Sequence, residues 1–234
     1  MRKFGKLFLA FALVGTVMVS CKESKGKDTS KETTVEASEP NGDARTHEKA
    51  ENSKTTAVLN ANLATEADLD GIGLSKEMIA QILDKRPFLS MNDFDVLVGD
   101  ETKEELYKKV FVPFNLNTTA EADFKMIPGV GDRMAHEFEE YRPYTSIQQF
   151  RREIGKYVDE DEVSRYENYV FVPVELNSAT EKDIKALPGV GNRMAHEFEE
   201  YRPYTSMAQF RKEIGKYVDD KELARLERLV YLKE

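Results

Sequence analysis

Cysteine and tryptophan are almost missing from this sequence of 234 residues, which has one Cys and no Trp. A single thiol excludes an intramolecular disulfide and any metal site built from several thiolates. Histidine is scarce too, and His136 and His196 stand singly on their segments, so no metal site is predicted. The sequence has no Ser-His-Asp order and no glycine-rich phosphate loop with a lysine. We therefore expect a binding protein and not an enzyme.

Positive charge is in deficit, because 34 Lys and Arg residues face 43 Asp and Glu residues, a net charge of -9. The chain as a whole lacks the basic character of a nucleic-acid-binding protein, so any case for DNA depends on local features. Long apolar runs are lacking as well. The main one, from Leu7 to Val19, is shorter than the ~20 residues of a membrane-spanning helix.

This apolar run has the form of an export signal. Arg2, Lys3 and Lys6 precede it, and Ser20-Cys21 ends it. Met18-Val19-Ser20-Cys21 resembles the lipobox of bacterial lipoproteins, with Met where Leu is usual. The resemblance implies that residues 1–20 are a signal peptide and that Cys21 is lipidated. The alternatives are an uncleaved anchor or an incidental free thiol, and the shortness of the run argues against an anchor. Lys22-Glu23 favours sorting to the outer membrane or the surface.

Residues 21–56 contain few large apolar side chains and cannot bury enough surface to fold. We interpret them as a tether. As a flexible coil, such a stretch spans roughly 30 to 35 Å, and about 120 Å when fully extended. The expected location is the cell envelope, on a membrane through the lipid anchor.

The rest of the chain is repetitive. Residues 115–174 and 175–234 are identical at 37 of 60 aligned positions, which indicates duplication. A diverged copy precedes them, because Arg86-Pro87-Phe88-Leu89-Ser90 matches Arg142-Pro143-Tyr144-Thr145-Ser146. The sequence therefore predicts three units, at 57–114, 115–174 and 175–234.

Each unit reads as four helices, without a competing strand pattern. Thr118-x-x-Glu121 and Ser178-x-x-Glu181 resemble capping boxes that open a short helix, which ends at Pro-Gly-Val-Gly. Further helices are predicted at 132–141 and 147–154. A last helix, opened by the Asp159-x-x-Glu162 cap, should reach Val170. The fold class expected is all-α.

Leu116-Asn117, Ile127-Pro128-Gly129-Val130-Gly131 with Ala135, and Tyr141-Arg142-Pro143-Tyr144 resemble the tandem helix-hairpin-helix domain of competence-type DNA receptors and DNA repair proteins. The resemblance covers about 59–234, and the motif occurs intact twice. In the first copy, Gly71-Ile72-Gly73 keeps the glycines but places the next helix about two residues out of register.

The resemblance implies sequence-independent contact with the phosphates of double-stranded DNA. A hairpin that leads into a helix presents unpaired N–H groups and a positive dipole end, where a phosphate oxygen can bind. The candidate DNA-binding residues are Gly129, Val130, Gly131 and Arg133 in one copy and Lys185, Gly189, Val190, Gly191 and Arg193 in the other. No cofactor is expected, although hairpins of this family often hold a monovalent cation, which the carbonyls at 129–131 and 189–191 would supply with ligands.

The acidic balance favours a different function. Residues 115–174 carry seven Lys and Arg against twelve Asp and Glu, and Asp132 lies where a phosphate would bind. Residues 175–234 carry eleven Lys and Arg against twelve Asp and Glu, and Asn192 stands at the position equivalent to Asp132. Glu137, Glu139 and Glu140 read as a solvated helix face. The alternative is thus a helical envelope scaffold that contacts a protein partner.

Overall fold

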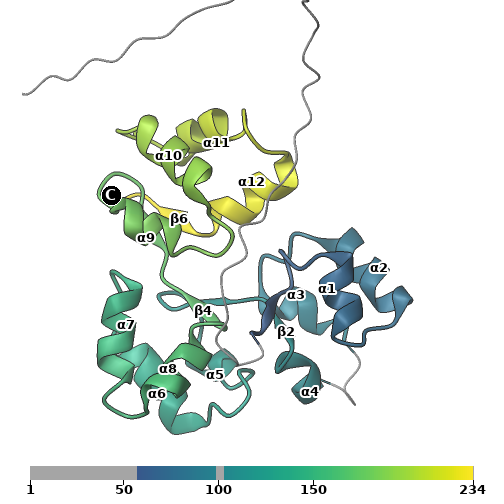
Figure 1. The fold of residues 1–234 in the computed structure, drawn as a ribbon. Coiled ribbons are helices and arrows are strands. Elements are labelled where there is room, and N and C mark those ends of the chain that lie inside the picture. Colours follow the sequence, from purple (N-terminus) through teal and green to yellow (C-terminus); the bar gives the residue numbers. More distant parts are fainter. Residues whose placement is uncertain (1–56, 99–102, 234) are drawn as a thin grey trace, which may run out of the picture. The chain divides into compact units, whose positions relative to one another are not determined.

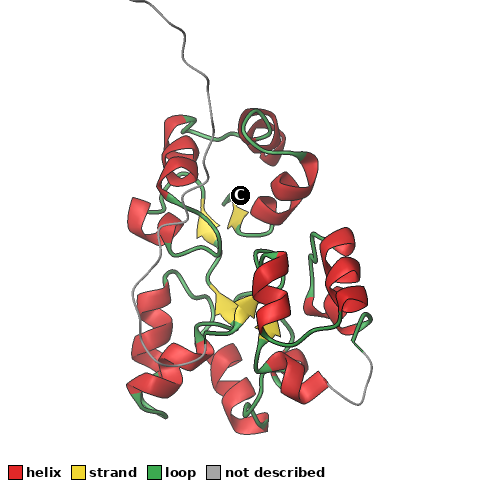
Figure 2. Ribbon diagram, turned by 45° about the vertical axis from the view of Figure 1, so that its right-hand side comes forward, coloured by secondary structure: helices red, strands yellow, loops and turns green. Residues whose placement is uncertain are grey.

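The computed structural model describes residues 57–98 and 103–233. The signal peptide, Cys21 and the tether expected at 1–56 lie outside the described residues. The described part of the chain is mainly helical, as expected, and also contains short strands that the sequence analysis does not predict (Figure 2).

Parallel pairs of two-residue strands divide the described chain into three segments of four helices each (Figure 1). Segment 1 comprises β1 (Leu59–Asn60), α1 (Glu66–Gly71), α2 (Lys76–Lys85), α3 (Met91–Asp95), α4 (Lys103–Tyr107) and β2 (Val110–Phe111). Segment 2 comprises β3 (Phe114–Asn115), α5 (Glu121–Phe124), α6 (Asp132–Glu140), α7 (Ile147–Ile154), α8 (Glu160–Tyr166) and β4 (Val170–Phe171). Segment 3 comprises β5 (Val174–Glu175), α9 (Glu181–Lys185), α10 (Asn192–Glu200), α11 (Met207–Ile214), α12 (Asp220–Glu227) and β6 (Val230–Tyr231).

The first and last strands of each segment pair with each other: β1 with β2, β3 with β4 and β5 with β6. In segment 2, the Phe114 N–H donates to the carbonyl of Tyr169 at 2.7 Å, and the Leu116 N–H donates to that of Phe171 at 3.0 Å. The two ends of a segment therefore lie side by side. The fourth helix of segment 2 ends at Tyr166, short of the predicted Val170, because that residue begins β4.

Two side-chain contacts explain why the Leu-Asn and Arg-Pro pairs recur together. In segment 2, the Asn117 amide donates to the carbonyl of Tyr144 at 2.8 Å and accepts from its N–H at 2.7 Å. The Arg142 guanidinium donates from Nε to the Leu116 carbonyl at 2.5 Å and from Nη2 to that of Thr119. The same contacts join Asn62 with Phe88, Arg86 with Ala61 and Ala64, Asn177 with Tyr204, and Arg202 with Leu176 and Ala179. Each pair fastens the start of its segment to the loop after the second helix.

The helix caps correct two sequence expectations. Helix α5 begins after Ala120, which gives no side-chain cap, so Thr118 does not open a capping box. In segment 3, the cap is Thr180, whose hydroxyl accepts from the Asp183 N–H at 3.2 Å, and not Ser178. The predicted Asp159 cap is confirmed, since its carboxylate accepts from the Glu162 N–H at 2.9 Å.

The core is continuous through segments 1 and 2, while a second cluster fills segment 3. Aromatic rings meet edge to face where segments 1 and 2 join: Phe111 lies 5.2 Å from Phe114 and 5.0 Å from Tyr169, between ring centroids. The Phe138 ring of α6 and the Phe198 ring of α10 are fully buried in their segments. Each fixes the helix that follows its glycine hairpin.

Candidate nucleic-acid interface

A glycine with positive φ stands at the same point of each segment, between the first and second helices. Gly73, Gly129 and Gly189 have φ values of 86°, 81° and 71°. This conformation is costly for residues with a Cβ. In segment 1 the turn glycine is Gly73 and not Gly71, and α2 begins three residues later, as α6 does after Gly129. The expected two-residue shift of that helix is therefore wrong.

The helices after the hairpins in segments 2 and 3 begin without a side-chain cap. Their N-cap residues are Gly131 and Gly191, which supply no capping oxygen. Apart from chain neighbours, no heavy atom lies within 4 Å of where a Cβ on either glycine would be. The first N–H groups of an α-helix lack intrahelical partners, so α6 and α10 each begin with N–H groups that no N-cap side chain satisfies, beside an open position at the glycine. In segment 1, Ser75 takes this position, and its hydroxyl accepts from the Met78 N–H at 3.2 Å.

Arg133 and Arg193 occupy the first turns of α6 and α10, and both are exposed. Neither forms an ion pair with a residue in the described ranges, 57–98 and 103–233. The Arg133 guanidinium lies 5.8 Å from the centre of the Tyr157 ring, a cation–π distance. Tyr157 in turn shares a hydrogen bond of 2.7 Å with Tyr141. Arg133 is thus held beside the hairpin, whereas no ring contact holds Arg193 among the described residues.

The charges beside the two hairpins are arranged differently. Lys125 forms an ion pair of 2.9 Å with Asp132, which raises the pKa of Lys125, first through the hydrogen bond and then through the charge. Lys185, the equivalent lysine, pairs instead with Glu181 at 2.6 Å, since Asn192 replaces the aspartate. The carboxylate that opposed phosphate binding in segment 2 is therefore partly neutralised by its own lysine.

The inner sides of the hairpins are occupied by protein cations. Arg225 donates from Nη1 to the Pro188 carbonyl at 2.6 Å, and Lys109 donates to the Ile72 carbonyl at 3.2 Å. The Leu63 side chain lies 2.8 Å from where a Cβ on Gly189 would be. In segment 2, an Arg165 nitrogen lies 3.3 Å from where a Cβ on Gly129 would be. The open side of the hairpins in segments 2 and 3 is consequently at the second glycine, not the first.

The two valines of the predicted sites have a structural role. Val130 and Val190 are 6% and 5% exposed, and their N–H groups donate within the hairpin, to the carbonyls of Ile127 at 3.0 Å and Leu187 at 3.1 Å. The structure brings together Gly131, Arg133 and the start of α6, and likewise Gly191, Arg193 and the start of α10. It places the valine side chains in the core.

Sequence reasoning missed a buried carboxylate in each close copy. Glu137 and Glu197 are 9% and 8% exposed, so the expectation of a solvated face is wrong for them, while Glu140 and Glu200 are exposed. One carboxylate oxygen of each has no hydrogen-bond partner in the described part of the chain. The hydrogen bond that the Tyr157 hydroxyl shares with Tyr141, and then the one that it donates to the Glu137 carboxylate, raise the pKa of Tyr157. The sequence does contain a signal for this burial. Glu137 follows Met134 by three residues and precedes Tyr141 by four, so it lies on the helix face of these predicted core residues.

Within residues 57–98 and 103–233, no cluster of three or more His, Cys, Asp or Glu side chains could hold a metal ion. None of the helices described in those ranges is both long and apolar enough to cross a bilayer. Comparison with protein-family models, with curated proteins and with solved structures gives no match.

Proposed function

We propose that this chain is a non-catalytic, lipid-anchored protein of the cell envelope that binds the DNA backbone through helix-hairpin-helix units. The observation that carries the proposal is the pair of open helix starts at Gly131 and Gly191, each with an exposed arginine two residues later. A phosphate at either place would receive backbone N–H groups, the positive end of the helix dipole and a guanidinium.

The three segments are proposed to be three such units with unequal roles. Segments 2 and 3 bind phosphate, and segment 1 is structural, because the Ser75 hydroxyl already occupies an N–H at the start of α2. Contacts of this kind reach phosphate oxygens and no base edges, so binding is independent of sequence.

The membrane link comes from the sequence. Lipidation at Cys21 and a tether over 21–56 would hold the folded part tens of ångströms from the bilayer. The location proposed is the cell envelope, with the lipid in the outer membrane.

The decisive experiment titrates the chain from residue 21, carrying Cys21→Ser, with two duplexes of unrelated sequence over a range of salt. We expect equal affinity for both duplexes and a logarithmic salt slope of about -0.9 for each phosphate contacted. The variant Gly131→Glu with Gly191→Glu fills both open sides with like charge and should abolish binding. Absence of binding at about 50 mM salt would contradict the proposal.

A monovalent cation at 129–131 and 189–191 is part of the same proposal. Replacing potassium chloride by tetramethylammonium chloride at equal ionic strength should weaken binding if these carbonyls hold a small cation, because the larger ion does not fit.

A protein partner is the second candidate function. The net charge of -9 opposes DNA and favours a basic partner, and Val96 and Leu89 on segment 1 are 85% and 51% exposed. Failure of the DNA titration together with capture of a basic envelope protein, lost in Val96→Asp, would establish this function instead.

A further inference from the structure

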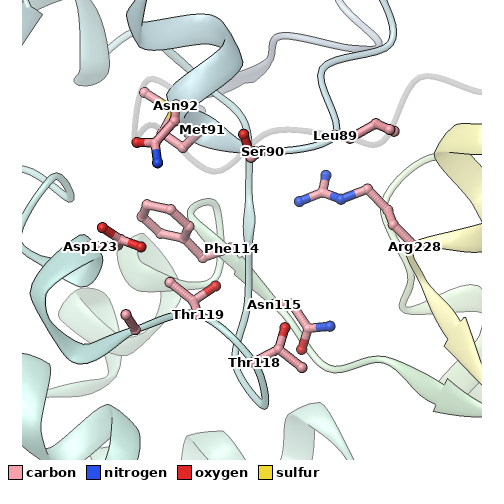
Figure 3. A pocket seen from close by; sticks show the side chains of 11 residues that line it. Leu89, Ser90, Met91, Asn92, Phe114, Asn115, Thr118, Thr119, Asp123 and Arg228 are labelled. Carbon is pink, nitrogen blue, oxygen red and sulfur yellow. The ribbon is translucent and has the colours of Figure 1, made fainter.

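A cavity of about 490 Å³ lies among the loop before α3, the start of segment 2 and Arg228 (Figure 3). Its volume falls within the range of small-molecule sites. It is separate from the glycine hairpins, since its lining includes none of the hairpin residues. Segment 2 supplies Thr118, Thr119 and Asp123 to it, and Phe114 forms an apolar wall.

Arg228 supplies positive charge to this cavity. Its Nη2 donates to the Pro113 carbonyl at 2.9 Å, and its guanidinium lies 5.1 Å from the centre of the Phe171 ring. Burial, together with the charge of Arg225, lowers the pKa of Arg228 to about 10, while the carboxylate of Asp93 acts in the opposite direction, and the guanidinium remains charged at neutral pH. No carboxylate in the described ranges forms an ion pair with it. Its remaining N–H groups are thus available to an anion.

Asp123 supplies negative charge, and the reason is a single difference between the segments. In segments 1 and 3 the equivalent aspartates belong to capping arrangements: Asp68 accepts from the Thr65 N–H at 2.8 Å, and Asp183 accepts from the Thr180 hydroxyl at 2.5 Å. In segment 2 Ala120 replaces this threonine, so the Asp123 carboxylate lacks that partner. No hydrogen bond or ion pair of the described residues engages it.

Asp123 and Arg228 lie on opposite sides of the cavity, with the Phe114 ring between them and neutral polar groups along another side (Figure 3). Arg228 and Asp123 form no ion pair with each other within the described part of the chain. The hydroxyls of Thr118 and Thr119 and the side-chain amide of Asn92 have no hydrogen-bond partner among the residues described. A molecule in this cavity would therefore meet a cation at one end, an anion at the other, and the Phe114 ring and hydroxyl and amide groups along its length.

We propose that this cavity binds a small zwitterion of the amino-acid class, with its carboxylate on Arg228 and its ammonium group on Asp123. Guanidinium and carboxylate groups make charge-assisted hydrogen bonds to these partners. Phosphate groups of DNA do not fit this description, because Asp123 repels a second negative charge. The site is a function separate from the hairpins and does not depend on DNA binding.

The test is an NMR titration of the chain from residue 21, carrying Cys21→Ser, with each of the twenty amino acids in turn. We expect at least one to bind with millimolar or tighter affinity and to shift the backbone signals of Thr118 and Thr119. Acetate and methylammonium each carry only one of the two charges. Their affinity should be lower than that of the best amino acid by about tenfold or more, the scale of one charge-assisted hydrogen bond.

Three variants in the cavity and one control variant outside it separate recognition from folding. Asp123→Asn and Arg228→Gln should each weaken binding about tenfold or more. Ala120→Thr rebuilds the capping arrangement, so it should draw the Asp123 carboxylate away and weaken binding while raising the thermal midpoint. Asp183→Asn, the same change at the equivalent position outside the cavity, should leave the affinity unaltered.

Absence of binding by every amino acid at about 20 mM would overturn the proposal, since paired charge-assisted contacts give millimolar affinity or better. Acetate binding as tightly as the best amino acid would overturn the zwitterion assignment. If Arg228→Gln fails to fold, the proposal is tested by Asp123→Asn and Ala120→Thr alone. Wild-type affinity in both variants would refute the role of the Asp123 carboxylate.

Discussion

The two arginines of the candidate interface should contribute unequally to DNA binding. Arg193 has no ion-pair partner among the described residues, and the exposed Lys182 on α9 takes the place of Ala122 in segment 2. Arg133 stacks on Tyr157 and stands next to Asp132. Replacing Arg193 by Ala should therefore cost about 1.5 kcal/mol, a little over tenfold in affinity, which is the lower end for a hydrogen bond to a charged group. Replacing Arg133 should cost less.

Asp132→Asn tests the same reasoning in the opposite direction. The carboxylate would compete with a phosphate for the start of α6, and it holds Lys125 in an ion pair of 2.9 Å. Its removal should strengthen binding by a few tenths to about 1 kcal/mol, roughly two- to fivefold. Because Lys125 is released as well, the salt slope should steepen by up to about 0.9, whereas loss of either arginine should make it shallower.

The assay is fluorescence anisotropy with a short labelled duplex, at several salt concentrations beginning near 50 mM. Asn192→Asp is the matched control, because it gives segment 3 the carboxylate of segment 2 and should weaken binding. Equal losses from the two arginine variants would refute the ranking. An unchanged affinity in Asp132→Asn would show that this helix start does not meet phosphate.

Three further predictions concern anchoring, stability and pH. Changing Cys21 to Ser should release soluble protein or leave uncleaved precursor, measured by membrane partition and mass; unchanged size and partition would contradict lipidation. Arg142→Lys should lower the free energy of unfolding, measured in urea, by about 2 kcal/mol, because a lysine cannot bond both of the carbonyls that the guanidinium bonds. Arg152→Lys, at an exposed position, is the control, and an equal loss in that variant would refute the argument. The hydrogen bond to Glu121 raises the pKa of His136 above 6.5. The stability that this pair contributes is therefore present below pH 6.5 and is lost as the pH rises through the pKa of the folded state. NMR titration of Glu121→Gln should show a lower His136 pKa, and an unchanged pKa would rule out the contact.

The helices could be predicted from the sequence where the chain offers periodicity and a capping side chain. The helix at 147–154 is found at those residues, and α6 ends one residue before its predicted end. The strands could not be predicted, because two residues are too few for an alternating pattern to appear. The Thr118 cap failed for a local reason: the N–H groups of Thr118 and Thr119 donate to the Asn115 carbonyl and form a turn before the helix begins.

The candidate site was predictable in its backbone and not in its side-chain pairing. Glycines at fixed spacing predict the turns, and Gly129 and Gly189 adopt the positive φ that the motif requires. The partner of Lys125 depends on which neighbouring carboxylate is within reach, which a sequence does not reveal. The cavity beside Arg228 is lined by residues far apart in the chain, so the sequence does not predict it. The feature of it that a comparison of the repeats reveals is Ala120, which stands where the other segments have a threonine.

The strand pairs have a mechanical consequence. In each parallel pair, the chain enters the segment at the amino end of one strand and leaves it at the carboxyl end of the other. Tension applied along the backbone, as between a bilayer and a bound polymer, would load the hydrogen bonds of a pair together in shear and would not peel them apart one at a time. With the polymer held on segment 3, the bonds from Phe114 to Tyr169 and from Leu116 to Phe171, at 2.7 and 3.0 Å, would thus bear the load before the helices of segment 2.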